Sequence, residues 1–131
     1  MSAKHEYWFE MAEYDLETAR AMLTTRRVLY VGFMCQQTIE KALKGLFVHV
    51  NPDVSVPYIH GVAKLAKYAN VYEVMSDHQK GILDVLEPMN IEARYPSVKD
   101  KLLASLTVSR CEEIIRETEA LMIWIKSKLL K

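Results

Sequence analysis

The sequence predicts an all-α protein, an antiparallel up-and-down four-helix bundle with an additional short helix. Apolar residues recur at steps of three and four along most of the chain, which is the period of an amphipathic helix. Valine-rich alternating segments, which would indicate strands, are scarce. Only four glycines and four prolines interrupt the 131 residues, and the prolines separate the periodic stretches. We therefore expect a single helical domain spanning residues 1–131.

The first helix is expected from about His5 to Thr25. Its apolar stripe consists of Trp8, Ala12, Leu16, Ala19 and Leu23. Asp15 lies beside this stripe, where the protein interior can draw it inward. The glutamates of the first turns suit the positive end of the helix dipole.

The second helix is expected from about Leu29 to Val50, because Asn51-Pro52 ends it. Its apolar stripe consists of Cys35, Ile39, Ala42, Leu43, Leu46 and Val50. Gly32 and Gly45 lie inside this helix, where each costs about 1 kcal/mol relative to alanine. Their presence indicates a close approach of another helix or of a ligand.

A short third helix is expected from about His60 to Asn70. The fourth helix begins at Ser76, because Ser76 and Gln79 have the spacing of a capping box. Pro88 then kinks or restarts this helix, whose second piece continues to about Arg94.

Pro96 to Ser105 is expected to form a loop, because the residue before a proline avoids α-helical geometry. The last helix follows, from about Leu106 or Thr107 to Leu130. Its apolar stripe consists of Cys111, Ile114, Thr118, Leu121, Ile125 and Leu129.

Composition predicts a cytoplasmic protein without a global charge. The net charge is zero, so any anion-binding site must be a local cluster. No apolar run approaches the length of a membrane span, and the N-terminus lacks the apolar region of a signal peptide. Cys35 and Cys111 both fall in predicted helices, which favours buried free thiols in a reducing compartment.

The second helix carries a polar face in addition to its apolar stripe. Gln37, Glu40, Lys41 and Lys44 recur at helical spacing, so their side chains meet. One explanation is a solvated face with a Glu40–Lys44 pair, worth a few tenths of a kcal/mol. The other is a cradle for an anionic ligand or a partner helix.

A wider cluster forms if the third helix and the end of the fourth pack near the second. It would bring together Lys41, Lys44, His60, Lys64, Arg94 and Tyr95. Arginine suits bidentate binding of phosphate, lysine offers a point charge, and tyrosine can stack on a base. Alternatively, Arg94 pairs with Asp15 or Glu40 and Tyr95 simply packs.

The chain lacks the residues that several kinds of metal-binding and nucleotide-binding site require. No histidine follows a glutamate by three residues, so a di-metal carboxylate site is not indicated. Two cysteines are too few for a structural zinc site. Neither a P-loop nor a Gly-x-Gly-x-x-Gly segment occurs. We therefore predict no metal, no cofactor and no assignable catalytic residue.

A set of residues spread along the chain resembles the HEPN family (higher eukaryotes and prokaryotes nucleotide-binding). In the first half these are Trp8, Ala12, Asp15-Leu16, Ala19, Cys35-Gln36-Gln37 and Ile39-Glu40-Lys41-Ala42-Leu43-Lys44. In the second half they are His60, Leu65 and Glu92-Ala93-Arg94-Tyr95-Pro96. The Gln-Gln-x-x-Glu-Lys-x-x-Lys run together with Ala-Arg-Tyr-Pro is the most specific part.

The resemblance implies a helical bundle that forms homodimers and binds a nucleotide, or binds and cleaves RNA. It also implies a partner, a minimal nucleotidyltransferase encoded by a neighbouring gene, in a toxin–antitoxin-like pair. HEPN ribonucleases carry an arginine followed by four to six residues and a histidine. Here the three positions that could follow Arg94 are Lys99, Asp100 and Lys101, so the motif is absent.

Three hypotheses follow. The leading one is a non-catalytic HEPN-type module that binds a nucleotide, a nucleotidyltransferase partner, or both. Its predicted nucleotide-binding residues are Gln37, Glu40, Lys41, Lys44, His60, Arg94 and Tyr95. The second is a diverged ribonuclease acting on RNA around Arg94. The third is a purely structural dimerisation module. Seven methionines and twelve aromatic residues in a small bundle predict apolar surface for a partner, and hence a homodimer.

Overall fold

The computed structural model describes residues 3–90 and 96–130, which contain six α-helices and no strand. The helices are α1 (Ala3–Thr24), α2 (Val28–Val50), α3 (Val62–Tyr68), α4 (Asp77–Leu86), α5 (Pro96–Ser105) and α6 (Val108–Ser127). Three 3-10 turns, η1 (Tyr72–Val74), η2 (Glu87–Asn90) and η4 (Lys128–Leu130), lie between or after them. The predicted all-α fold is confirmed.

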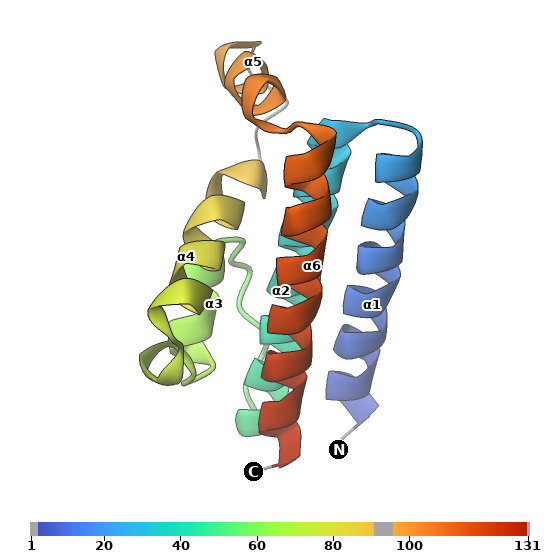
Figure 1. Cartoon of the computed structure of the whole chain (residues 1–131). Coiled ribbons are helices and arrows are strands. Elements are labelled where there is room, and N and C mark those ends of the chain that lie inside the picture. The colour runs from blue at the N-terminus through green and yellow to red at the C-terminus, as the bar shows by residue number, and fades with distance from the viewer. Residues whose placement is uncertain (1–2, 91–95, 131) are drawn as a thin grey trace.

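Helices α1, α2, α4 and α6 form the bundle, and successive members run in opposite directions (Figure 1). Helices α1, α2 and α6 pack side by side, and α3 and α4 cover the side of α2 that faces away from α1 (Figure 1). Helix α2 contacts all of these helices, which places it at the centre of the molecule.

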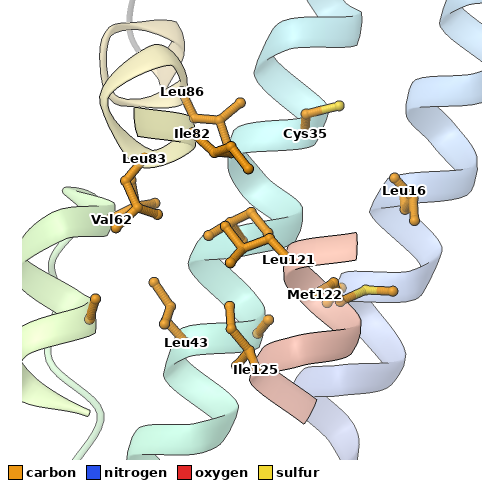
Figure 2. Close-up of a cluster of buried hydrophobic side chains, with 14 of the residues drawn as sticks. Leu16, Cys35, Leu43, Val62, Ile82, Leu83, Leu86, Leu121, Met122 and Ile125 are labelled. Atoms are coloured by element: carbon orange, nitrogen blue, oxygen red, sulfur yellow. The ribbon is translucent and has the colours of Figure 1, made fainter. Parts of the chain in front are cut away.

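The core lies between α1, α2, α3, α4 and α6. Figure 2 shows Ile82, Leu83 and Leu86 of α4 directed toward the same interior as Leu43 of α2 and Leu121 and Ile125 of α6. Burying one such side chain stabilises the fold by about 1.5–3 kcal/mol. The predicted stripes are largely correct, with two exceptions. Phe9 rather than Trp8 is the buried aromatic residue of α1, and Val50, predicted in the stripe of the second helix, is 44% exposed at the last residue of α2.

Gly45 allows α1 and α2 to approach closely. A Cβ atom at this position would lie 2.8 Å from Phe9 Cε2 and 3.1 Å from Trp8 Cβ. The close helix contact that the sequence indicated at this glycine is therefore present, and its partner is α1.

The third predicted helix begins later than expected. Helix α3 starts at Val62, so His60 lies in the preceding extended segment and not on the helix. The side chain of Glu87 explains this start, because its Oε1 accepts from the backbone N–H groups of Val62 and Ala63 at 3.1 and 3.4 Å.

The fourth helix ends near its proline, as expected. Helix α4 begins after the predicted capping box, in which Gln79 N–H donates to Ser76 Oγ at 3.1 Å and Ser76 N–H donates to Gln79 Oε1 at 2.9 Å. It ends at Leu86, and Pro88 lies in the 3-10 turn η2. The rest of the predicted second piece lies in residues 91–95, outside the described residues.

The expectation of a loop over 96–105 is wrong, because Pro96–Ser105 forms helix α5. Pro96 is the first residue of this helix, a position where its fixed φ angle fits and its missing N–H has no helical partner to lose. The proline therefore begins a helix here in addition to ending the preceding segment.

Cys35 and Cys111 are buried free thiols, as predicted. Burial raises the pKa of Cys35 to about 12 and raises the pKa of Cys111. No helix in the described part of the chain is long and apolar enough to cross a membrane.

Candidate functional site

The polar face of α2 is buried. Gln36, Glu40 and Lys44 follow one another at intervals of one helical turn, and their exposed fractions are 0%, 4% and 6%. The solvated-face explanation is therefore wrong for Glu40 and Lys44, whereas Gln37 and Lys41 of the predicted face are half-buried. Helix α1 covers one side of the buried residues, and the segment before α3 covers the other.

Glu40 is the centre of this cluster. Lys44 Nζ donates to its Oε2 at 2.9 Å, so the predicted pair forms, but in the interior. Gln36 Nε2 donates to its Oε1 at 3.2 Å. A buried carboxylate is tolerated when its charge is paired and its oxygens accept hydrogen bonds. Lys44 supplies the opposite charge, and Lys44 and Gln36 donate the hydrogen bonds.

His60 joins the cluster through its side chain and its backbone. Its Nδ1 lies 3.2 and 3.3 Å from the two carboxylate oxygens of Glu40, and its carbonyl oxygen accepts from Gln36 Nε2 at 2.9 Å. The His60 side chain is nevertheless 64% exposed. The cluster thus reaches solvent at this imidazole.

Gln37 connects the cluster to the turn after α4. Its Nε2 donates to Gln36 Oε1 at 2.8 Å and lies 3.3 Å from Asn90 Oδ1 and 3.5 Å from Glu40 Oε1. The fully buried Gln36 amide therefore has partners for both its oxygen and its nitrogen. Such a satisfied network holds its members in one arrangement.

Lys41 belongs to a second ion pair. Its Nζ donates to Asp15 Oδ2 of α1 at 2.5 Å, and Asp15 is buried, as its place beside the apolar stripe suggested. Each lysine on this part of α2 is therefore matched by its own buried carboxylate.

Helix α1 also covers Lys44, through the side chain of Trp8. The Lys44 ammonium lies 5.8 Å from the centre of the Trp8 ring, within range of a cation–π interaction. Lys44 is thus enclosed by Trp8 and Glu40, and 8% of its side chain is exposed. It stabilises the interior carboxylate and offers little surface to a ligand.

The structure brings together Gln37, Glu40, Lys44 and His60 of the seven predicted site residues. Lys41 lies nearby on α2 with its own partner. Arg94 and Tyr95 lie outside the described residues, and Lys64 is exposed on α3.

Sequence reasoning missed Gln36 and Asn90 as members of the cluster. Gln36 precedes Glu40 by four residues, so the helical spacing already placed it on the same face. Asn90 gave no such signal, because the 3-10 turn that carries it reaches α2 only in the folded chain.

The cluster does not have the character of a metal site. Among residues 3–90 and 96–130, no three His, Cys, Asp or Glu side chains are arranged to hold a metal ion. The central carboxylate is already paired with an ammonium. The group available to a ligand is the exposed imidazole of His60, which the buried carboxylate of Glu40 holds in place. The amide side chains of Gln36 and Gln37 lie beside this carboxylate.

The family model of the HEPN domain matches residues 5–128 of the chain. The chain belongs to the HEPN family. The HEPN domain therefore spans nearly the whole sequence, and the resemblance noted from the sequence motifs is confirmed.

Two crystal structures share the fold of this HEPN domain. TT1696 from Thermus thermophilus superposes with a TM-score of 0.76 at 24% sequence identity, covering 95% of this chain and 98% of that one. ST0689, an archaeal HEPN homologue, superposes with a TM-score of 0.71 at 23% identity, covering 95% and 97%. No curated protein sequence matches the chain significantly.

Proposed function

We propose that this HEPN domain is a non-catalytic module that binds a nucleotide, free or within RNA, where the polar cluster of α2 meets the surface. The observation that carries the proposal is the Glu40 network, which is buried at Lys44 and Gln36 and exposed at His60. Burying a charge pair often stabilises a protein no more than apolar packing would, so its presence favours a role beyond stability.

In this proposal, the members of the network have different roles toward the ligand. His60 would meet a phosphate group, and the amides of Gln37 and Asn90 would bind polar groups of the nucleotide. Glu40 and Lys44 would orient these groups from within. Arg94 and Tyr95 stay in the proposal on sequence grounds alone, as phosphate and base contacts.

Thermal melting with and without millimolar ATP or GTP tests the proposal. A ligand at about 100 times its dissociation constant stabilises the folded state by about 2.7 kcal/mol, which raises Tm by several degrees in a small domain. The rise should be smaller in His60→Gln, which keeps the rest of the cluster, and lost in Arg94→Ala.

Two variants serve as matched controls. His78 is also an exposed histidine beside a glutamate, with Nε2 3.3 Å from Glu117 Oε2, so His78→Gln should keep the rise. Lys126→Ala lies outside the cluster and should keep it as well. If ATP, GTP and a short oligoadenylate all leave Tm of the unchanged protein where it is, the proposal fails.

A protein partner is the second candidate function. Tyr7 and Tyr14 are 57% and 68% exposed, and their spacing of two helical turns places them on one face of α1. Exposed aromatic residues of this kind are typical of interfaces, which fits a homodimer or a nucleotidyltransferase partner of a toxin–antitoxin-like pair.

The mass of the purified protein in solution, alone and with the nucleotidyltransferase of a neighbouring gene, tests this candidate. If the protein forms a homodimer or a complex with this nucleotidyltransferase, the double variant Tyr7→Lys, Tyr14→Lys should abolish it. A protein that stays monomeric and binds no such enzyme would exclude it.

The ribonuclease alternative requires cleavage of RNA without the usual motif. We expect none from the purified protein. Cleavage that disappears in Arg94→Ala would favour this alternative over the binding module.

A further inference from the structure

We infer that a nucleotide phosphate binds this cluster together with one proton, which His60 takes up. The inference rests on the proposed function, because it concerns the same site. It adds that the positive charge which the described part of the cluster turns toward the ligand comes from the imidazolium of His60 and not from the lysines of α2, beside the phosphate contact proposed for Arg94. The ligand class is therefore a phosphate ester whose binding depends on pH.

The charges of the cluster lead to this inference. Lys44 is neutralised by Glu40, and Lys41 is neutralised by Asp15. Among the described residues, these groups leave no net charge for an anion while the His60 ring is neutral. One proton on His60 supplies that charge, and it does so at the exposed end of the cluster.

The hydrogen bond of His60 determines what its outer nitrogen can do. Nδ1 faces both oxygens of Glu40, so it carries the hydrogen that it donates to the carboxylate. In the neutral ring, Nε2 then presents a lone pair, which repels a phosphate oxygen. In the protonated ring, Nε2–H donates to that oxygen through a charge-assisted hydrogen bond.

The charged groups near His60 come from three elements. Glu40 contacts it from α2, and Lys44 approaches the same carboxylate oxygen, Oε2. Glu87 of η2 accepts from the N–H groups at the start of α3, directly after Gly61. A Cβ atom at Gly61 would lie 2.8 Å from Glu87 Oε2. Lys64 is exposed on the first turns of α3.

These contacts hold the backbone on both sides of the ring. The Gln36 amide binds the His60 carbonyl, and Glu87 anchors the residues that follow. Gln36 and Glu40 therefore act as positioning residues, which keep the imidazole in place while its protonation state changes.

Calorimetric titration across about pH 5.5 to about pH 8.5 tests the inference, because imidazoles titrate within this range. The probes are ATP and a short oligoadenylate without a terminal phosphate. The phosphodiesters of the oligoadenylate do not titrate in this range, whereas the terminal phosphate of ATP does, so the proton count for ATP is read as the difference from His60→Gln. Each titration is repeated in two buffers with different ionisation enthalpies, which yields the number of protons taken up. The unchanged protein and His78→Gln should take up more protons than His60→Gln, by an amount that is small near about pH 5.5 and grows toward one proton as the pH rises.

The affinity for the oligoadenylate should also fall by up to about tenfold per pH unit once the free imidazole loses its proton. This dependence should vanish in His60→Gln, whose fold is checked by its melting temperature without ligand. Binding of ATP alone would identify a free nucleotide as the ligand, and binding of the oligoadenylate would identify RNA.

A spectroscopic measurement separates this role from a structural one. At a pH where the free ring is mostly neutral, adding the probe should shift the His60 Nε2 resonance in a ¹H–¹⁵N spectrum toward its protonated position. Binding with unchanged pH dependence in His60→Gln would overturn the inference and leave the proposed function standing. Absence of binding at every pH would overturn both.

Discussion

Lys44 and Lys126 each pair with a glutamate, but the two pairs differ in how far they are removed from water. Lys44 and Glu40 have side-chain exposures of 8% and 5%, whereas Lys126 and Glu13 have exposures of 53% and 51%. Water screens the second pair, so it contributes at most about 1 kcal/mol. Breaking the first leaves a buried charge without its partner.

We therefore expect Lys44→Met to lower the free energy of unfolding by about 3–5 kcal/mol. Lys126→Met should change it by no more than about 1 kcal/mol, because its pair is exposed. Urea denaturation of both variants measures the difference. Adding Glu40→Leu to Lys44→Met should recover much of the loss, and equal effects of the two single variants would contradict the buried pair.

The Cys35 thiol should be unreactive in the folded protein. Burial raises its pKa to about 12 from the ordinary 9.0, so at pH 8 about one molecule in ten thousand carries the reactive thiolate. Because the folded-state pKa is the higher one, this thiol favours the folded state fully below pH 9 and progressively less above it. Iodoacetamide at pH 8 should label Cys35 only after unfolding, as mass spectrometry would detect.

Glycines in the helices illustrate how one residue type has different consequences in different elements. Gly45 lies where α2 meets α1, and a Cβ atom there would be 2.8 Å from Phe9. Gly81 lies in α4, and a Cβ atom there would meet nothing within 4 Å. Glycine disfavours a helix equally at both positions, so the difference between them comes from packing alone.

We expect Gly81→Ala to raise the free energy of unfolding by about 0.5–1 kcal/mol, because alanine favours a helix. Gly45→Ala should lower it by about 1–2 kcal/mol, since the clash with an aromatic ring outweighs the same gain. Thermal or urea denaturation compares the two. A stabilising Gly45→Ala would mean that α1 and α2 do not approach as closely as described.

Helix α5 differs from the other elements of the molecule in how it packs. It lies apart from the bundle at the end opposite the two termini (Figure 1). Residues 99–101 and 103–105 are exposed, and Leu102 is its partly buried contact with the core. Helix α3 is shorter, but Val62, Leu65 and Ala66 bury it against its neighbours.

Hydrogen exchange should therefore be faster in α5 than in α3, although α5 has ten residues and α3 has seven. Tertiary packing, more than length, protects a short helix from opening. Mass spectrometry of deuterated peptides measures both helices in one experiment, with α2 as the slow reference. Slower exchange in α5 would indicate that another surface covers it.

The fold class, the main core stripes and the capping box at Ser76 follow from the amino-acid pattern alone. Each of these depends on spacings of three or four residues, which are local and remain the same whatever the rest of the chain does. The prediction was wrong for α5, whose apolar pattern is weak. Its proline can end the preceding helix or begin a new one, and the sequence alone does not distinguish these two effects.

The tertiary structure decided which polar residues form the cluster. Glu40 and Lys44 were visible as a helical pair, but their burial depends on Trp8 and His60, which lie far from them in the sequence. Whether a charged face of a helix meets water or protein is set by the elements that cover it, and that information is not contained in the period of the helix itself.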